Sequence, residues 1–260
     1  MDNSTQSFNE LAKYYDNDFT NTELGKLLRS RTHDLMVNLF PAGSSVLEIN
    51  CGTGEDAAFL ARQGVQVLAT DGSAEMINCS RDKITRLGLS DKVTLKHCRF
   101  EELDSILEEG QIFDGILSNF GGINCAEELG ILSKNISQRV RQGGYIFLCI
   151  MGRWTLWEWL YLGYKRKFTR IRERICGECN WRGYTIRYFS PREALEYFEP
   201  YCKLAKISGL GLLLPPTYAG SVVIRYPKFF HFLNFIEKHI ESIPGVAQFS
   251  DHFILILKRT

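Results

Sequence analysis

The sequence predicts a doubly wound α/β fold, with a mostly parallel sheet of seven strands and helices on both of its faces. Short apolar runs alternate with helical stretches through the first half of the chain. Strands that alternate with helices need crossover connections, which produce a parallel sheet covered on both faces. The chain has 260 residues, 45% of them hydrophobic, so it can bury a large core. We therefore expect one domain over residues 1–260.

The first part of the chain, residues 1–42, is predicted to be a helical cap, because apolar residues recur at helical spacing from Phe8 to Phe40. The period then changes, and residues 43–151 are expected to form the core of the fold. The expected strands of this core are Ser45–Asn50, Val65–Thr70, Lys92–Cys98, Phe113–Ser118 and Tyr145–Met151, and the expected helices are Asp56–Arg62, Ala74–Leu87 and Cys125–Arg141.

The alternation breaks at residues 152–189, which are rich in Trp, Tyr, Lys and Arg, and we expect an insertion or lid there. Ser190 followed by Pro191 is a typical helix start and indicates that the core resumes. Residues 190–260 are expected to complete the core, with strands at Leu204–Leu214 and His252–Lys258 and a helix near Lys228–Ile240.

A glycine-rich turn follows the first expected strand. Gly52 and Gly54 lie between this strand and the next helix, where glycine lets a ligand approach the backbone closely. Open α/β sheets bind ligands at this carboxyl end of their strands. The second strand ends at Asp71, whose carboxylate can accept hydrogen bonds from two ribose hydroxyls. Together, these features predict a nucleoside site.

Two classes of cofactor fit this pattern. Gly52 to Ala57 satisfies the dinucleotide pattern G-x-G-x-x-A, and Asp71 lies near the expected offset of ~20 residues. A pyrophosphate at the helix N-terminus would be repelled by Glu55 and Asp56. S-adenosylmethionine carries a sulfonium and an ammonium instead, so these acids and Glu48 favour it. An NAD(P)-dependent oxidoreductase stays open as the alternative.

The residues from Val46 to Gly54 resemble the first motif of class I S-adenosylmethionine-dependent methyltransferases, E/D-x-G-x-G-x-G, which have a Rossmann-like fold. Asn50 replaces one glycine of the motif, and asparagine tolerates the left-handed backbone conformation better than most residues. The residues from Leu68 to Met76 resemble the second motif. That resemblance implies that Asp71 holds the ribose and that Met76 packs on the adenine.

Three further segments are similar to the same family. Arg99 stands where the family commonly has an acid against the adenine amino group, so Phe100 or Glu101 would serve there. The residues from Phe113 to Gly122 resemble the fourth strand, which implies that Asn119 lies near the transferred methyl. Phe8 to Asp16 is similar to the segment that covers the cofactor in methyltransferases of small molecules and quinones. The implied cofactor-binding residues are Tyr15, Glu48, Asn50, Cys51, Gly52, Gly54, Asp71, Gly72, Met76, Arg99, Phe100 and Asn119.

The insertion has an unusual composition over residues 154–174, where aromatic residues are followed by a basic cluster. Trp154, Trp157 and Tyr161 would fall on one face of a helix. This face could pack on the domain, form an aromatic wall for the acceptor, or make a peripheral contact with a membrane. We expect a small, hydrophobic acceptor. No nucleic-acid partner is expected, because Ser118-Asn119-Phe120-Gly121 lacks the motif associated with methylation of base amines.

Other features limit the possible functions. Lys plus Arg (31) nearly equal Asp plus Glu (30), so the net charge gives no long-range attraction to a polyanion. The N-terminal residues are polar and no run approaches ~18 apolar residues, so a cytoplasmic protein is expected. Cys176 and Cys179 have zinc spacing but lack a second pair, so no metal is expected.

The sequence does not identify a catalytic residue. In-line methyl transfer needs alignment in a dry pocket more than a covalent nucleophile, and no pairing of histidines indicates a base. A non-catalytic protein that keeps the methyltransferase fold is a third hypothesis. The oligomeric state cannot be predicted from the sequence.

Overall fold

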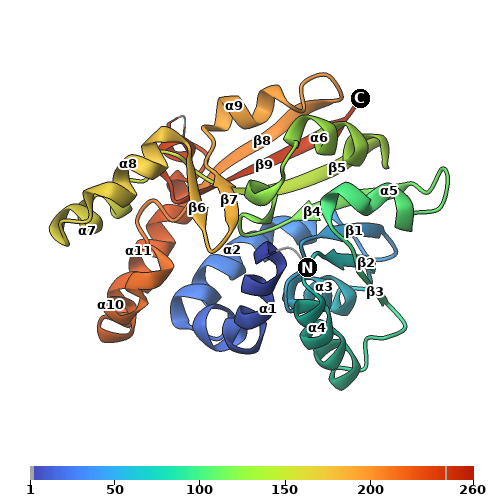
Figure 1. Ribbon diagram of the computed structural model, residues 1–260, viewed down its shortest axis with the longest axis horizontal. Helices are drawn as coiled ribbons and strands as arrows, with labels where there is room; N and C mark the ends of the chain where they lie inside the picture. The colour runs from blue at the N-terminus through green and yellow to red at the C-terminus, as the bar shows by residue number, and fades with distance from the viewer. Residues whose placement is uncertain (1–2, 244) are drawn as a thin grey trace.

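The computed structural model describes residues 3–243 and 245–260, and it has a seven-stranded sheet in the order β3-β2-β1-β4-β5-β9-β8 (Figure 1). Strands β1 to β5 are parallel, while β9 runs antiparallel to both β5 and β8. The predicted doubly wound, mostly parallel fold is thus confirmed. The strands are β1 (Ser45–Ile49), β2 (Gln66–Asp71), β3 (Val93–His97), β4 (Phe113–Ser118), β5 (Val140–Met151), β8 (Cys202–Leu210) and β9 (His252–Arg259).

Helices cover both faces of this sheet, because successive strand residues point to opposite sides. In β1, Val46 enters one hydrophobic cluster and Leu47 the other. Helices that pack into the first cluster are α2 (Glu23–Leu39), α3 (Glu55–Arg62), α4 (Ala74–Arg86), α10 (Gly220–Arg225) and α11 (Pro227–Ile240). Helices that pack into the second are α5 (Leu103–Ile106), α6 (Leu129–Gln138), α9 (Pro191–Glu196) and α12 (Val246–Phe249).

The helical cap consists of α1 (Asn3–Tyr15), a π-helix η1 (Asp16–Thr20) and α2. Thr22 caps α2, since its side chain accepts a hydrogen bond from the Gly25 amide (3.0 Å). Helix α1 is fixed to α4, because Ser73 Oγ donates to Asn9 Oδ1 (2.6 Å). Ser73 also caps α4. The first helix therefore lies next to the carboxyl end of β2.

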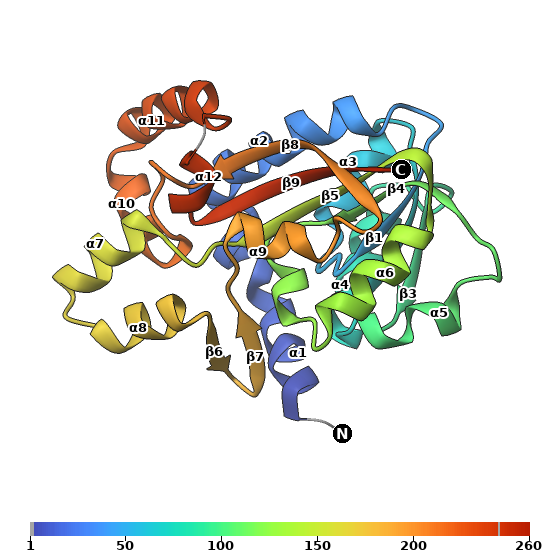
Figure 2. The same cartoon turned by 90° about the horizontal axis from the view of Figure 1, so that it is seen from above.

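The insertion forms two helices and a hairpin: α7 (Leu156–Tyr164), α8 (Phe168–Cys176), β6 (Glu178–Trp181) and β7 (Tyr184–Arg187). Arg182 (φ 50°) and Gly183 (φ 89°) both adopt left-handed conformations, as a two-residue hairpin turn of type I′ requires. The hairpin lies beside α1, where the rings of Phe8 and Tyr184 are 4.6 Å apart (Figure 2). The insertion thus contacts the cap.

Some predicted boundaries were wrong. The expected helix at Cys125–Arg141 is divided into a 3-10 helix, η3 (Gly122–Cys125), and the later α6. Trp154 precedes α7 and does not share a helical face with Trp157 and Tyr161, because the extended backbone at Arg153 bonds to the Phe189 carbonyl (2.9 Å). Within the described residues, no helix is both long and apolar enough to cross a membrane.

Candidate functional site

A cavity opens at the carboxyl ends of β1, β2 and β4, where open α/β sheets bind their ligands. Nine of the twelve predicted residues line it: Tyr15, Asn50, Gly52, Asp71, Gly72, Met76, Arg99, Phe100 and Asn119. The remaining three, Glu48, Cys51 and Gly54, lie behind the cavity wall. The structure therefore brings most of the predicted site together, and the contacts of these residues with a cofactor stay a prediction.

The two loop glycines have different roles. Gly52 (φ 54°) borders the cavity, and nothing lies within 4 Å of the position that a Cβ would occupy. A Cβ on Gly54 (φ 76°) would lie only 2.0 Å from Ser80 Oγ of α4. Gly52 thus leaves the backbone open to a ligand, whereas Gly54 allows α3 and α4 to pack closely.

Asn50 adopts the left-handed backbone conformation, with φ 56°, as the sequence predicted. Its side chain donates to the main-chain oxygen of Asn119 (3.2 Å) and accepts from Ser118 Oγ (2.7 Å). A Cβ on Gly122 would lie 2.0 Å from Asn50 Cγ, so Gly122 provides the space for this amide. The side chain of Asn50 therefore joins the carboxyl ends of β1 and β4.

Asp71 is held by the backbone around it. Its two carboxylate oxygens accept hydrogen bonds from the amides of Gly52 (2.9 Å) and Ser73 (2.8 Å). Burial raises the pKa of Asp71, while these amide hydrogen bonds oppose the shift. A carboxylate oxygen has further lone pairs, so Asp71 can still accept two ribose hydroxyls at the cavity wall.

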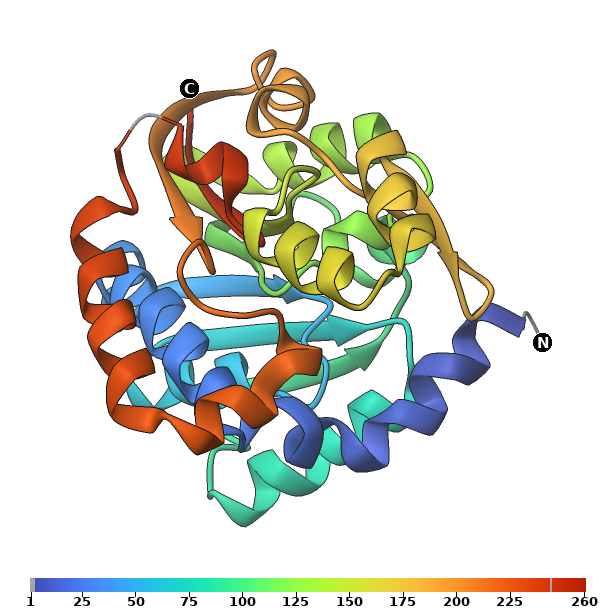
Figure 3. The same ribbon diagram turned by 90° about the vertical axis from the view of Figure 1, so that its left-hand side faces the viewer.

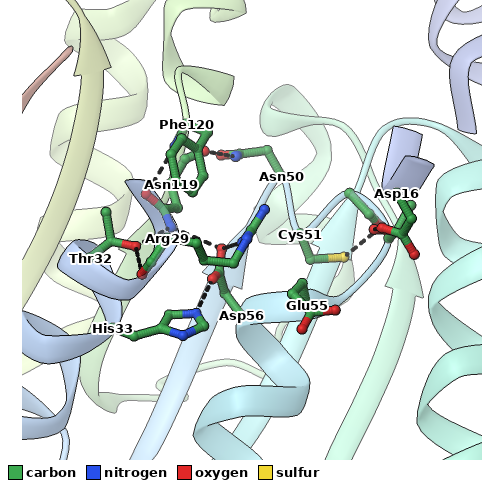
Figure 4. Close-up of polar contacts among 12 residues, drawn as sticks. Asp16, Arg29, Thr32, His33, Asn50, Cys51, Glu55, Asp56, Asn119 and Phe120 are labelled. Carbon is green, nitrogen blue, oxygen red and sulfur yellow. Dashed lines mark hydrogen bonds and ion pairs between the residues drawn. The ribbon is translucent and has the colours of Figure 1, made fainter. Parts of the chain in front are cut away.

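A cluster of charged side chains lies behind the glycine loop, with Asp56 at its centre (Figure 4). Asp56 contacts Arg29 Nη1 (2.6 Å) and His33 Nε2 (2.7 Å), and it accepts from Asn119 Nδ2 (2.9 Å). Burial alone would raise the pKa of Asp56, but Arg29 and His33 hold it well below its usual range. Asp56 is thus fully engaged within the protein.

The neighbouring acid is also paired. Lys83 Nζ lies 2.8 Å from Glu55 Oε2 and 2.8 Å from Asp16 Oδ2. Thr53 of the loop donates to Asp16 (2.6 Å), which connects the loop to the cap. The expectation that Glu55 and Asp56 would attract a cationic ligand is therefore not supported, because cations of the chain itself neutralise both.

The Glu48 side chain lies on the same side of the sheet as the Asp56 cluster. It is 1% exposed. Among the described residues, its Oε2 has no hydrogen-bond partner. Burial raises the pKa of Glu48 well above its ordinary value, and the nearby Asp56 charge adds to this shift. Glu48 therefore contributes to the site as a buried, protonation-prone group rather than as an exposed charge.

Asn119 lies at the end of β4, but its amide does not point to the cavity. It donates to Asp56 and to Thr32 Oγ1 (3.2 Å), and its oxygen accepts from the Phe120 amide (3.0 Å). These contacts favour the interpretation that Asn119 satisfies buried polar groups. Its partner Thr32 on α2 was missed from the sequence, as were Arg29 and His33, the partners of Asp56 on the same helix. The sequence did contain one indication of these partners. Arg29 and His33 are four residues apart, which places them on one face of a helix.

The walls around the expected adenine are apolar. Met76 is 3% exposed, and both Met76 and Phe100 line the cavity. Arg99 forms ion pairs with Glu101 (3.5 Å) and Glu127 (3.2 Å) at the rim. Its guanidinium is thus directed toward acids of the protein.

The aromatic wall comes from a different part of the insertion than expected. No residue of 154–164 lines the cavity, whereas Tyr184 of β7 and Phe8 of α1 do. Helices α7 and α8 lead the chain away from the cavity and the hairpin brings it back, which the sequence pattern did not reveal. Phe120 adds a third ring, and it packs between Arg29 and Phe19 (4.8 and 4.9 Å).

Comparison with known proteins assigns the fold to a family. Residues 46–144 match the family model described as a methyltransferase domain. Residues 46–144 thus match a methyltransferase domain of the kind that the sequence motifs predict. The match covers the glycine loop, Asp71 and β4, so the predicted cofactor class is confirmed for the domain. This assignment favours S-adenosylmethionine over the dinucleotide alternative.

Curated relatives share part of the chain. A demethylmenaquinone methyltransferase of Clavibacter sepedonicus is 29% identical over 144 residues, which are 55% of each chain. A tRNA 5-carboxymethoxyuridine methyltransferase of Escherichia coli (strain K12) is 27% identical over 107 residues, 40% of this chain and 41% of that one. The chain thus spans about half the length of the curated relatives that it matches or less.

A solved structure shares the fold over a longer range. The geranyl diphosphate C-methyltransferase of Streptomyces coelicolor A3(2), in complex with Mg²⁺, geranyl diphosphate and S-adenosyl-L-homocysteine, superposes with a TM-score of 0.58. The two chains are 14% identical, and the match covers 89% of this chain and 79% of that one. This similarity supports the fold alone.

Proposed function

We propose that this protein transfers the methyl group of S-adenosylmethionine directly to a small, apolar acceptor bound in the same cavity. The observation that carries this proposal is the composition of the cavity wall. Asp71 and Gly52 lie on one side, where a nucleoside can bind, and the rings of Phe8, Phe120 and Tyr184 contribute an aromatic part. One cavity thus offers surfaces that suit both a nucleoside and an apolar molecule.

The residues on the wall suggest how the cofactor is held. Asp71 would accept both ribose hydroxyls, and Met76 and Phe100 would contact the two faces of the adenine. The open backbone at Gly52 would allow the methionine part to approach. The cofactor would supply an electrophilic methyl group, and the chain would orient it and exclude water.

The transfer itself is an in-line displacement. An electron pair of the acceptor forms the new bond to the methyl carbon while the carbon–sulfur bond breaks, and the sulfonium becomes a neutral thioether. Tyr15 lines the cavity, but burial raises the pKa of its phenol, so it stays protonated at neutral pH. It would serve as a lid contact or donor, not as a base.

The relatives differ in their printed substrates, which include a quinone, a tRNA and a terpenoid diphosphate. The ring contact between Phe8 and Tyr184 favours a small acceptor, because α1 and the hairpin meet beside the cavity. A nucleotide within a folded RNA would have to be extruded past these two elements. We therefore place the acceptor among small apolar molecules.

Cofactor binding can be tested by calorimetry with S-adenosylmethionine and S-adenosylhomocysteine. The Asp71→Asn variant should bind either ligand roughly ten- to a hundredfold more weakly, because a charged acceptor of two hydroxyls is lost. Asp91→Asn, at an exposed acid before β3, is the matched control and should bind like the wild type. Absence of heat with both ligands, or heat with NAD instead, would refute the proposal.

The acceptor class needs a separate assay. Transfer of labelled methyl from S-adenosylmethionine should be seen with a demethylated quinol, whose electron-rich ring carbon forms the new bond and then releases its proton to solvent, and not with unmodified tRNA. Tyr184→Ala should raise the KM for the quinol more than it weakens the binding of the cofactor. Transfer to tRNA alone would contradict the small-molecule proposal while leaving the cofactor assignment intact.

A further inference from the structure

The outer face of α11 is apolar and exposed. Phe229, Phe232 and Phe235 recur every three residues and are 55%, 58% and 61% exposed. Phe230 and Glu237, on the opposite side of the helix, are buried. A helix on the surface of a domain needs one apolar face to pack on the core, whereas α11 has a second apolar face on its outer side. This outer face is available for a partner.

A second apolar face lies on α7 and at the start of α8. Leu160, Tyr164 and Phe168 are four residues apart and are 66%, 82% and 64% exposed. Helix α7 is connected to the segment before α10, because Tyr218 donates to Glu158 (3.0 Å) and its ring lies 5.5 Å from that of Tyr161. Figure 3 shows α7, α8, α10 and α11 on the same side of the molecule.

Basic residues surround these apolar side chains. The exposed ones are Lys165, Arg166, Lys167, Arg170, Arg172, Arg225 and Lys228. Glu173 is the only acid in residues 164–176, and Glu237 is the only acid in residues 218–240. Glu237 is buried and accepts from the amides of Gly211 and Leu213 (2.7 Å each), so it does not offset the surface charge. The side of the molecule formed by α7, α8, α10 and α11 is therefore both positive and apolar.

We propose that this side docks on an anionic lipid bilayer. The protruding aromatic and leucine side chains would enter the boundary between headgroups and acyl chains, and the lysines and arginines would contact lipid phosphates. The contact would be peripheral. A second copy of the chain is a poorer partner, because a twofold interface would place one basic cluster close to its own symmetry mate.

Docking would bring the cavity near the membrane. The insertion that carries Lys165 to Arg172 also provides Tyr184 to the cavity wall. Delivery of a membrane-dissolved acceptor to the cavity is a consequence that rests on the proposed function, whereas the docking surface does not.

Flotation with phosphatidylcholine vesicles, with and without phosphatidylglycerol, tests the proposal. The wild type should float with the anionic vesicles, less so at high salt, and should not float with phosphatidylcholine alone. Phe232→Ser should weaken the partition about tenfold. Lys165→Ala should weaken it about fivefold, through loss of one contact with the anionic surface.

Matched controls lie on other surfaces. Ile131→Ser alters a side chain on α6 that is 61% exposed, and Arg192→Ala removes an exposed charge on α9, away from α11 (Figure 1). Both should float like the wild type. Calorimetry with S-adenosylmethionine on the same samples distinguishes a failure of docking from a failure of the proposed function.

Two outcomes would overturn the docking surface. One is a wild type that does not float with anionic vesicles at low salt, or a Phe232→Ser variant that floats equally well. The other is a wild type that is a dimer by light scattering and a Phe232→Ser variant that is a monomer, when both float equally well. That result would assign the apolar face to a second copy.

Discussion

Asn50 combines a left-handed backbone with two side-chain hydrogen bonds that glycine could not make. The left-handed conformation costs most residues roughly 1–2 kcal/mol, and asparagine less. The amide in turn connects β1 to Ser118 and to the Asn119 carbonyl. The departure from the glycine motif is thus explained by the contacts between two strand ends.

The left-handed backbone at Asn50 predicts an unusual order of stability for two substitutions at this position. Asn50→Ala should be less stable than Asn50→Gly, since both lose the amide but only alanine keeps the backbone strain. The difference should be about 1 kcal/mol in the free energy of unfolding. Urea denaturation of the two variants measures it.

Asn135 on α6 provides the matched comparison, because it lies inside a regular helix. There the order should reverse, with Asn135→Ala more stable than Asn135→Gly by a similar amount. An Asn50→Ala variant as stable as Asn50→Gly would show that the strain is relieved in some other way.

Single residues differ in how well the sequence predicts them. Asn50 and Asp71 could be assigned because their roles depend on neighbours within the same loop and strand end. Glu55, Asp56 and Asn119 could not, because their respective partners, Lys83, Arg29 and Asp56, are distant in sequence. From the sequence alone, a carboxylate is expected to be available to a ligand, because the cation that pairs with it is not evident.

Arg174 shows how one element is fixed to the sheet. It is 6% exposed and bonds to the carbonyl of Gly152 (2.7 Å), to Asp251 Oδ1 (3.0 Å) and to Glu158. Burial alone would raise the pKa of Asp251, but His252 and Arg174 hold it well below its usual range. This cluster joins α7, α8 and the start of β9.

Arg174→Met should destabilise the protein by about 3–5 kcal/mol, because it removes the buried guanidinium that the carboxylates of Glu158 and Asp251 share. Arg172→Met, on the exposed side of the same helix, should change the free energy of unfolding by less than about 0.5 kcal/mol. Equal stabilities of the two variants in denaturant titrations would contradict the role of the cluster.

The hairpin and the first helix stabilise each other at the cavity. Tyr184→Ala removes the ring contact with Phe8, so amide hydrogen exchange in α1 should become faster, by about threefold to tenfold for a lost aromatic pair. Tyr164→Ala, which removes a ring that is 82% exposed on α7, should leave exchange in α1 unchanged. Unchanged exchange in both variants would mean that α1 is held by other contacts, such as Asn9 with Ser73.

Elements were predictable where a period extends over many residues. The alternation from Ser45 to Met151 identified the sheet, because buried strands and amphipathic helices differ in spacing. The hairpin of β6 and β7 was missed, since its strands have four residues each and are only half buried. Its turn, Arg182-Gly183, is a weaker signal than the Asn-Gly pair that usually marks such hairpins.

At the scale of the whole molecule, two groups of buried or partly buried carboxyls respond to pH in opposite directions. The pKa values of Asp16, Asp56 and Asp251 are lowered in the folded protein, in each case because neighbouring cations or donors outweigh the effect of burial. Their contribution to stability is present above pH ~4 and is lost as the pH falls through the folded-state pKa values.

Glu48, Asp71 and Glu237 behave the other way, because burial raises their pKa values. The folded state then binds more protons than the unfolded state above pH ~4, so stability falls as the pH rises toward the folded-state pKa values. Together the two groups predict a stability maximum near pH ~5 rather than at neutral pH.

Glu48→Gln tests the predicted decrease of stability with rising pH above this maximum. Glutamine closely matches the protonated form of Glu48, so the variant and the wild type should be similar in stability at about pH 4–5. With rising pH the variant should gain relative to the wild type, by at most about 1.4 kcal/mol per pH unit. The exposed Glu109→Gln should show no such gain. Thermal melts of the three proteins between about pH 4 and pH 8 measure the difference, and a constant offset between Glu48→Gln and the wild type would mean that the Glu48 carboxyl is ionised in the folded protein throughout.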